Sequence, residues 1–279
     1  MSVVILPIYP WARARSVWQR AEELGCHAAY TYDHLSWRQF RDGPWFGAVP
    51  TLTAAATATE RLRLGTLVTS PNFRHPVTLA KDLMSLDDIS GGRLTVGVGA
   101  GGTGFDATVL GQQPWSAAER ADRFGEFVPL LDQLLREPVT DHTGRFYAAH
   151  EARMVPGCVQ RPRAPFLIAA TGRRGLALAA RYGQGWVTGA EDPSDQLTRL
   201  AAACTEAGRD PAELRKVVMT GFGADDPPTS VDAVVERAGR YKQHGVSELV
   251  VHWPVPDSQF DLDQGLFERI LTEVPYQVG

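Results

Sequence analysis

The feature of this sequence that most constrains its fold is the regular alternation of two kinds of segment. Short runs rich in Val, Ile and Leu are typical of buried strands, and each is followed by a longer stretch of helical period. Eight such pairs follow one another along the chain. Because consecutive parallel strands need a crossover helix between them, this alternation predicts a parallel sheet covered by helices.

The predicted elements are short and follow one another closely. The strands cover residues 2–8, 27–33, 61–68, 93–99, 165–170, 184–189, 214–220 and 247–253. Helices are predicted at 11–25, 76–89, 116–136, 175–182, 195–207, 231–245 and 264–274, with an Ala- and Thr-rich helix before residue 60. Eight repeats within 279 residues are typical of a (β/α)8 barrel, which we expect to span 1–279 as a single α/β domain. A doubly wound open sheet is the alternative.

One segment interrupts the alternation after the fourth strand–helix pair. Residues 137–164 contain three prolines and lack a clear helical period. The run GRFYAAHEARM, residues 144–154, predicts a small hairpin within this segment. We therefore expect an insertion that leaves the barrel intact.

Composition and charge argue against several classes of protein. A net charge of −4 creates no strong attraction to nucleic acid or to an anionic membrane. Pro7 and Pro10 interrupt the apolar N-terminal run, which lacks basic residues, so we expect a first strand rather than a signal peptide. Cys26, Cys158 and Cys204 are too scattered for a disulfide framework or a metal site. These features predict a cytoplasmic protein without a bound metal and without nucleic-acid or membrane partners.

A glycine-rich segment follows the fourth predicted strand. RLTVGVGAGGTGFD, residues 93–106, has G-x-G-x-x-G spacing at Gly97, Gly99 and Gly102, as dinucleotide-binding loops do. Those loops open a helix at the third glycine and are followed by an acidic residue about 20 residues on. Here the next helix begins only after Pro114. We therefore reject the dinucleotide interpretation and expect a backbone-lined ligand site at the C-terminal face of the barrel, with a ligand-free turn as the alternative.

Polar residues follow other predicted strands on the same face. Asp33, His34 and Trp37 come after the second strand, and residues 171–174 join the fifth strand to a helix. Because helix N-termini attract anions, Thr171, Gly172, Arg173 and Arg174 predict a phosphate site, with a solvated basic turn as the alternative for the arginines. His34 is the candidate proton donor, because imidazole has the intrinsic pKa nearest neutral. A structural histidine is the alternative.

Four segments together resemble the bacterial luciferase-like flavin oxidoreductase superfamily. They are TYDH, the block LGTLVTSPNFRHPVTLAKDLMSLDDISGGRLTVGVGAG, HTGRFY, and PFLIAATGRRGLALAARYGQGWVTG, and the resemblance covers nearly the whole chain. It implies a (β/α)8 barrel, in agreement with the strand count. It also implies that FMN or the deazaflavin coenzyme F420 binds at the C-terminal face.

Details of the resemblance favour F420 over FMN. Asp33 and His34 match the Asp–His pair that F420-dependent members place beside the reactive ring, and Trp37 lies one residue closer to the histidine than their active-site tryptophan. Ala100 stands where FMN-dependent luciferases carry a phosphate-binding arginine. Gly102 stands where sugar-phosphate-oxidising members carry a glutamate, which argues against that reaction but not against F420 binding.

The resemblance also implies a site. We expect hydride transfer between reduced deazaflavin and an activated C=C or C=N bond of a small organic molecule, with His34 donating the proton. Asp33 would orient His34 or contact the coenzyme, and a non-proline cis peptide between Leu67 and Val68 would form a bulge behind the ring. The implied catalytic residues are His34, Asp33 and Trp37, and the implied coenzyme-binding residues are Asp33, Leu67, Val68, Thr69, Gly99, Ala100, Gly101, Gly102, Ala170, Thr171, Gly172, Arg173 and Arg174.

Two other functions remain open from the sequence. One is a two-component FMNH2-dependent monooxygenase, and the other is a flavin-binding barrel without catalysis. For the enzyme we expect a small-molecule substrate and a separate flavin or deazaflavin reductase that supplies reduced cofactor. A homodimer is compatible with this interpretation.

Overall fold

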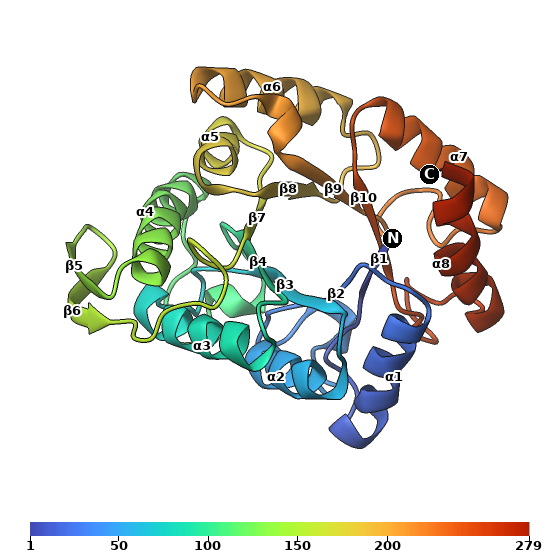
Figure 1. Cartoon of the computed structure of the whole chain (residues 1–279), viewed down its shortest axis with the longest axis horizontal. Coiled ribbons are helices and arrows are strands. Elements are labelled where there is room, and N and C mark those ends of the chain that lie inside the picture. Colours follow the sequence, from blue (N-terminus) through green and yellow to red (C-terminus); the bar gives the residue numbers. More distant parts are fainter. Residues whose placement is uncertain (279) are drawn as a thin grey trace.

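The computed structural model describes residues 1–278, in which eight parallel strands close into a barrel (Figure 1). Their order around the barrel is β1-β10-β9-β8-β7-β4-β3-β2. The bounds are β1 (Ser2–Val4), β2 (Ala28–Thr31), β3 (Arg63–Thr69), β4 (Leu94–Gly99), β7 (Phe166–Ala169), β8 (Gly185–Thr188), β9 (Arg215–Met219) and β10 (Glu248–His252). Because β1 pairs with both β2 and β10, the sheet has no free edge. The predicted (β/α)8 barrel is confirmed, and the open-sheet alternative is wrong.

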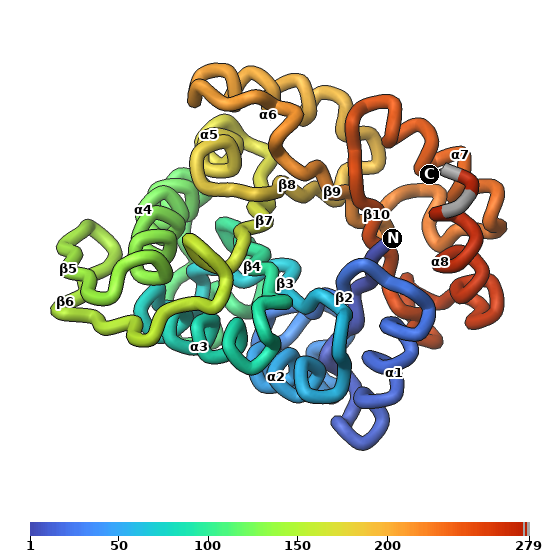
Figure 2. Tube along the Cα trace, viewed as in Figure 1, coloured from blue at the N-terminus to red at the C-terminus, as the bar shows by residue number. Residues whose placement is uncertain are grey.

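Helices surround the barrel in chain order (Figures 1 and 2). They are α1 (Trp11–Glu23), α2 (Ala48–Ala58), α3 (Pro76–Ile89), α4 (Ala117–Arg136), α5 (Arg173–Tyr182), α6 (Ser194–Glu206), α7 (Val231–Gln243) and α8 (Gln264–Val278). Arg20 of α1 donates hydrogen bonds to Glu268 of α8 at 2.5 and 3.3 Å, which joins the first helix to the last. The ring of helices is thereby closed.

The N-termini of two helices show how local sequence starts an element. Ser116 and Glu119 form a reciprocal capping box at the start of α4, since each side chain accepts from the other's backbone N–H. Pro76 is the first residue of α3, where its missing N–H has no intrahelical partner to lose. Both starts agree with the predicted helices.

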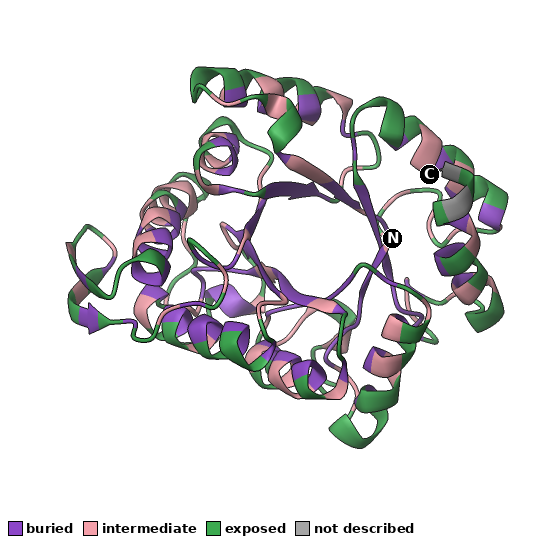
Figure 3. Ribbon diagram, in the orientation of Figure 1, coloured by how far each residue is buried: buried purple, intermediate pink, exposed green. Residues whose placement is uncertain are grey.

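The apolar side chains form two layers. One fills the space between strands and helices, and the other fills the interior of the barrel. Alternation along β1 shows the division, because Val3 belongs to the outer layer and Val4 to the interior. Figure 3 shows buried residues along the strands and on the barrel-facing sides of the helices. The strands are therefore covered on both faces, and polar side chains can reach solvent mainly at the barrel ends.

Several predicted boundaries differ from the structure by a few residues, and two of these differences have a clear physical cause. The hairpin consists of β5 (Val139–Thr143) and β6 (Ala148–Arg153), so its first strand precedes the predicted segment 144–154. Its strands are largely exposed and polar, and such strands lack the apolar alternation that reveals a buried one. The first strand was predicted over 2–8 but ends at Val4, and Pro7 has no N–H to continue a ladder.

Candidate functional site

A cavity of about 650 Å³ opens at the C-terminal ends of the barrel strands. It contains eleven of the predicted residues: His34, Val68, Gly99, Ala100, Gly101, Gly102, Ala170, Thr171, Gly172, Arg173 and Arg174. The sequence analysis did not select Ser70, Ala121, Phe124, Ala169, Gly175, Val187, Thr188 and Gly189, which also line it. The volume lies within the range of about 300–1,000 Å³ typical of small-molecule sites. The fold thus brings the ends of several strands and the start of α5 around one space.

The wall formed by β3 and β4 contains the predicted bulge. The two strands pair at Thr66 with Val96 and again at Thr69 with Val98, so β3 has one extra residue between these pairs. The Leu67–Val68 peptide is cis, as predicted. A Cβ atom at Gly99 would lie 2.7 Å from a methyl carbon of Val68, so only glycine lets β4 pack against this bulge. Two of the predicted residues around it do not line the cavity: Leu67 packs into the barrel interior, and Thr69 is fully buried.

The opposite wall is the N-terminus of α5. The first N–H groups of any α-helix lack an intrahelical partner, and here the N-cap residue, Gly172, provides no side chain to cap them. Arg174 forms an ion pair with Asp122 of α4, and the guanidinium of Arg199 donates to the carbonyl oxygen of Thr171 at 3.2 Å. Backbone donors and cationic side chains therefore meet at one end of the cavity. This arrangement suits an anionic group.

His34 lies on the rim of the cavity with 30% of its side chain exposed. Its Nδ1 atom is hydrogen-bonded to Oδ2 of Asp106. The other carboxylate oxygen of Asp106 accepts the backbone N–H of Leu35 at 2.8 Å, and the Trp45 indole donates to the His34 carbonyl oxygen at 2.7 Å. When the ring is neutral, a carboxylate at Nδ1 places the proton there and leaves the lone pair on Nε2.

Asp106 is the functional candidate that sequence reasoning missed. It is the last residue of the glycine-rich segment RLTVGVGAGGTGFD and lies in a short 3₁₀ turn, Phe105–Ala107. Only 3% of the residue is exposed. The available signal was an acidic residue in a loop at the C-terminal face of the barrel. A carboxylate that becomes buried there needs a hydrogen-bonding partner. Its partner is 72 residues away in the chain, so the sequence did not identify the pair.

Asp33 is bonded to Arg74 and not to His34, which was one of the two partners expected for it. Both of its oxygens accept hydrogen bonds from Arg74, at 2.6 and 3.0 Å, and the carboxylate is fully buried. Burial alone would lower the pKa of Arg74, but its hydrogen bonds to Asp33 and the negative charge there raise the pKa above its ordinary value. The orienting contact with His34 is therefore made by Asp106 and not by Asp33, because Arg74 occupies both oxygens of Asp33.

Trp37 lies beside the cavity rather than in its lining. Its ring stacks near Phe40 and Phe260, with centroids 6.0 and 6.1 Å away, and meets Tyr32 edge-on at 5.1 Å. These aromatic contacts hold the segment after β2 against the barrel mouth. Trp37 thus supports the position of His34 within this segment, whereas a direct role in catalysis stays a prediction.

A second histidine, His252, ends β10 at the same face. Its Nε2 atom is hydrogen-bonded to the hydroxyl of Tyr32 at 2.7 Å, and its ring stacks on Phe260 with centroids 3.8 Å apart. Nδ1 is buried without a hydrogen-bond partner among the described residues. Burial lowers the pKa of His252 to about 3, because the charged imidazolium would lose its hydration. This histidine is neutral at physiological pH.

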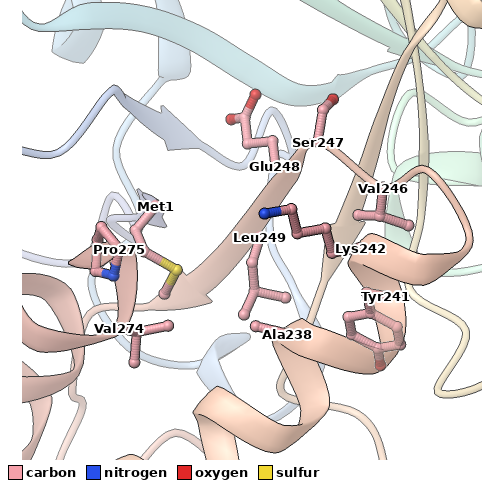
Figure 4. Close-up of a pocket in the computed structure, with 10 residues that line it drawn as sticks. All are labelled: Met1, Ala238, Tyr241, Lys242, Val246, Ser247, Glu248, Leu249, Val274 and Pro275. Carbon is pink, nitrogen blue, oxygen red and sulfur yellow. The ribbon is translucent and has the colours of Figure 1, made fainter. Parts of the chain in front are cut away.

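Another cavity, of about 280 Å³, lies at the opposite end of the barrel. Figure 4 shows it between the starts of β1 and β10 and the ends of α7 and α8, with Lys242 extending from α7 toward Leu249. Glu248, at its edge, accepts a hydrogen bond from the Tyr30 hydroxyl at 3.2 Å. None of the predicted site residues lies here, and this end of a (β/α)8 barrel ordinarily contributes to stability rather than chemistry.

Residues 1–278 contain no metal-type cluster, no exposed cysteine and no membrane-spanning helix. No three His, Cys, Asp or Glu side chains in this range gather as a metal site would require. All three cysteines are buried, and burial raises the pKa of the Cys26 thiol to about 12. None of the described helices combines the length and apolar character that crossing a bilayer requires.

Two curated proteins similar in sequence to this chain are F420-dependent dehydrogenases. An F420-dependent hydroxymycolic acid dehydrogenase of Mycobacterium tuberculosis is 33% identical over 205 residues, covering 71% of this chain and 55% of the relative. An F420-dependent glucose-6-phosphate dehydrogenase of Beutenbergia cavernae is 35% identical over 171 residues, covering 60% of this chain and 49% of the relative. The chain thus spans about half the length of these relatives.

Two solved structures share the fold. A coenzyme F420-dependent tetrahydromethanopterin reductase of Methanopyrus kandleri superimposes with a TM-score of 0.77 at 19% identity, covering 100% of this chain and 97% of that one. An F420-dependent secondary alcohol dehydrogenase in complex with an F420–acetone adduct gives 0.82 at 20% identity, covering 100% of both chains. At these identities the likeness concerns the fold.

The family itself follows from a match over most of the chain. Residues 6–255 match the model of the luciferase-like monooxygenase family. This range includes every barrel strand except β1 and contains all the residues that line the cavity at the C-terminal face. The chain belongs to the luciferase-like monooxygenase family.

Proposed function

We propose that this chain is an F420-dependent oxidoreductase that transfers a hydride between the deazaflavin and a small organic molecule. The observation that carries the proposal is one cavity that combines an apolar wall, a helix N-terminus with two arginines and a histidine bonded to a carboxylate. The F420-dependent dehydrogenases among its relatives support the choice of coenzyme.

The residues of the cavity fit such a coenzyme. Val68, Ala100, Ala169, Ala170 and Val187 provide an apolar surface for a flat ring system. A Cβ atom built at Gly102 would meet nothing closer than 4.0 Å, and one at Gly172 nothing within 4 Å, so side chains at these positions would take up the open space. The start of α5 would hold a phosphate. Ala100 places a methyl group where FMN-dependent luciferases carry an arginine, which favours F420 over FMN.

The chain's own groups would manage the proton. Bound F420 supplies a hydride acceptor or donor in its deazaflavin ring. His34 holds or releases a proton at Nε2 on the rim of the cavity, while Asp106 occupies Nδ1. In the reducing direction His34 would donate to the carbon or nitrogen that has received the hydride. In the oxidising direction it would take the proton of a hydroxyl group.

The substrate and the partners belong to this proposal. Activated C=C and C=N bonds stay our predicted acceptors. Secondary alcohols join the test panel because one solved structure with this fold is named as an F420-dependent secondary alcohol dehydrogenase. A separate reductase would supply reduced coenzyme, and a homodimer is compatible with the single barrel domain that we propose for the chain. Turnover that depends on added substrate would distinguish an enzyme from a non-catalytic flavin-binding barrel.

Side-by-side calorimetric titration with F420 and FMN tests the coenzyme. We expect F420 to bind more tightly. FMN binding tenfold more tightly, a difference of about 1.4 kcal/mol, would overturn the proposal and favour an FMNH2-dependent monooxygenase.

The phosphate end is tested by the double variant Arg173→Ala/Arg174→Ala. Loss of two cations beside the α5 N-terminus should weaken F420 binding about tenfold at low salt, since ion pairs of this kind contribute about 0.7 kcal/mol each and tenfold corresponds to about 1.4 kcal/mol. Arg181→Ala, at the exposed C-terminal end of the same helix, is the matched control and should leave affinity unchanged. Equal F420 affinities in the two variants would show that Arg173 and Arg174 belong to a solvated basic turn and do not bind the coenzyme.

A further inference from the structure

We infer that Asp106 is the positioning residue of the site: its carboxylate fixes the orientation and the tautomer of the His34 ring. The inference rests on the proposed function, in which Nε2 of His34 faces the substrate. Both oxygens of Asp106 contact the segment after β2, one at Nδ1 of His34 and the other at the N–H of Leu35. The carboxylate therefore contacts both the ring and the adjacent backbone.

Burial makes this contact selective. The side chain of Asp106 is only 4% exposed, so water barely competes for its oxygens. An ionised carboxylate accepts hydrogen bonds and cannot donate them, so a neutral imidazole must present N–H at Nδ1. The partner thereby determines which nitrogen carries the lone pair. This is the role that a carboxylate plays toward a catalytic histidine in other enzyme classes.

The loop that carries Asp106 is held by contacts that do not involve His34. Asn72 donates to the carbonyl oxygen of Gly102 at 3.1 Å, and Gln112 donates to the carbonyl oxygen of Asn72 at 3.1 Å. Gly101 has a φ of +77°, and a Cβ there would lie 2.4 Å from Oδ1 of Asn72, so the loop needs glycine at this point. Asp106 therefore meets His34 from a loop that is already anchored.

Neighbouring groups do not replace Asp106 as the hydrogen-bonding partner of the His34 ring. Asp33, the nearest carboxylate in sequence, has both oxygens bonded to Arg74. Trp45 donates to the backbone carbonyl of His34 and leaves the ring free to turn. Within the described residues, the hydrogen bond that orients the imidazole of His34 comes from Asp106.

Asp106→Asn tests the inference, because it keeps the shape and removes the charge. An amide can donate to Nδ1 as well as accept from it, so the variant should lose the single tautomer. We expect ¹⁵N NMR of the His34 side chain to show Nδ1–H in the neutral wild type and a mixture in Asp106→Asn. F420 affinity should change less than threefold, and turnover with a substrate panel of secondary alcohols, enones and imines should fall about 10²–10⁴-fold.

Two further variants separate positioning from general stability. Asp87→Asn is the matched control, because Asp87 is a fully buried carboxylate that accepts two hydrogen bonds from Gln160, at 3.0 and 2.7 Å. It should lower the melting temperature without changing the tautomer of His34. Asp106→Glu keeps the charge and should keep the Nδ1–H tautomer.

The outcomes are distinct. A pure Nδ1–H tautomer in Asp106→Asn would overturn the inference, as would a tautomer mixture in the Asp87→Asn control. Loss of the tautomer in Asp106→Asn would support positioning even if the wild type turned over no compound of the panel. In that case the proposed function would fail and the role of Asp106 toward His34 would stand.

Discussion

The two histidines at the barrel mouth, His34 and His252, have similar places in the fold and opposite surroundings. His34 follows β2, and His252 is the last residue of β10. The ring of Tyr32 lies between them, 5.9 Å from His34 and 5.8 Å from His252. His34 is partly exposed and bonded to a carboxylate, whereas His252 is 7% exposed and bonded to a hydroxyl.

The difference shows that a place at a strand end does not by itself make a histidine a candidate for proton transfer. Beside Asp106 the charged form of His34 has a compensating charge and access to the cavity. His252 is hydrogen-bonded to a hydroxyl and does not line this cavity, and burial lowers its pKa to about 3, so its imidazole is neutral near pH 7. Partner and burial thus separate a candidate proton carrier from a packing residue.

The largest expected effect is on turnover. His34→Ala should lower turnover about 10²–10⁴-fold, because a positioned acid or base contributes that much, while F420 affinity changes only a few-fold. His252→Gln is the comparison variant and should keep turnover within about threefold of wild type, well below the effect of removing a general acid. Steady-state kinetics and F420 titration measure both. Unchanged turnover in His34→Ala would contradict the proposed difference between the two histidines. Abolished F420 binding would show that His34 contacts the coenzyme instead of transferring a proton.

The second effect concerns stability in acid. The unfolded chain binds a proton at His252 below about pH 6.5, whereas the folded chain does so only near pH 3, so the unfolded state is favoured as the pH falls through this window. The free energy of unfolding should fall by about 1.4 kcal/mol per pH unit between pH 6 and 4 from this group alone. Urea unfolding of wild type and His252→Gln measures the difference in slope. Equal slopes would show that His252 takes up its proton over the same pH range in the folded and the unfolded protein.

The smallest effect isolates the partner of His252. Tyr32→Phe removes the hydroxyl that bonds Nε2 of His252 and leaves a buried nitrogen without a partner. Such a loss costs about 1–3 kcal/mol of stability. Thermal unfolding should show the loss, while the tautomer of His34 stays that of the wild type. A changed His34 tautomer would mean that the two histidines are coupled through Tyr32.

Much of the fold was predictable because its signals are local. Alternating strand and helix patterns predicted the barrel, and the N-cap residue Ser116 and the first-turn residue Pro76 lie at helix starts in the structure. The hairpin was less predictable, since β5 and β6 are exposed and their polar sequence carries no burial pattern. Its first strand was therefore missed.

For the site, the sequence predicted which strand ends lie together but not which side chains contact one another. Parallel strands in a closed barrel all end at one face, so the order of elements alone places His34, the glycines after β4 and the start of α5 around one cavity. The sequence by itself determined that gathering. It also contained the family pattern from which the cis peptide at Leu67–Val68 was expected.

Only the tertiary structure decided which polar groups meet. Arg74 takes both oxygens of Asp33 from 41 residues away, and Asp106 reaches Nδ1 of His34 across 72 residues. The periodicity of a sequence reports which face of an element is buried, but a hydrogen bond depends on distances of a few tenths of an ångström between loops. Those distances arise from how the loops after β2, β3 and β4 pack together, and no local pattern in the chain encodes them.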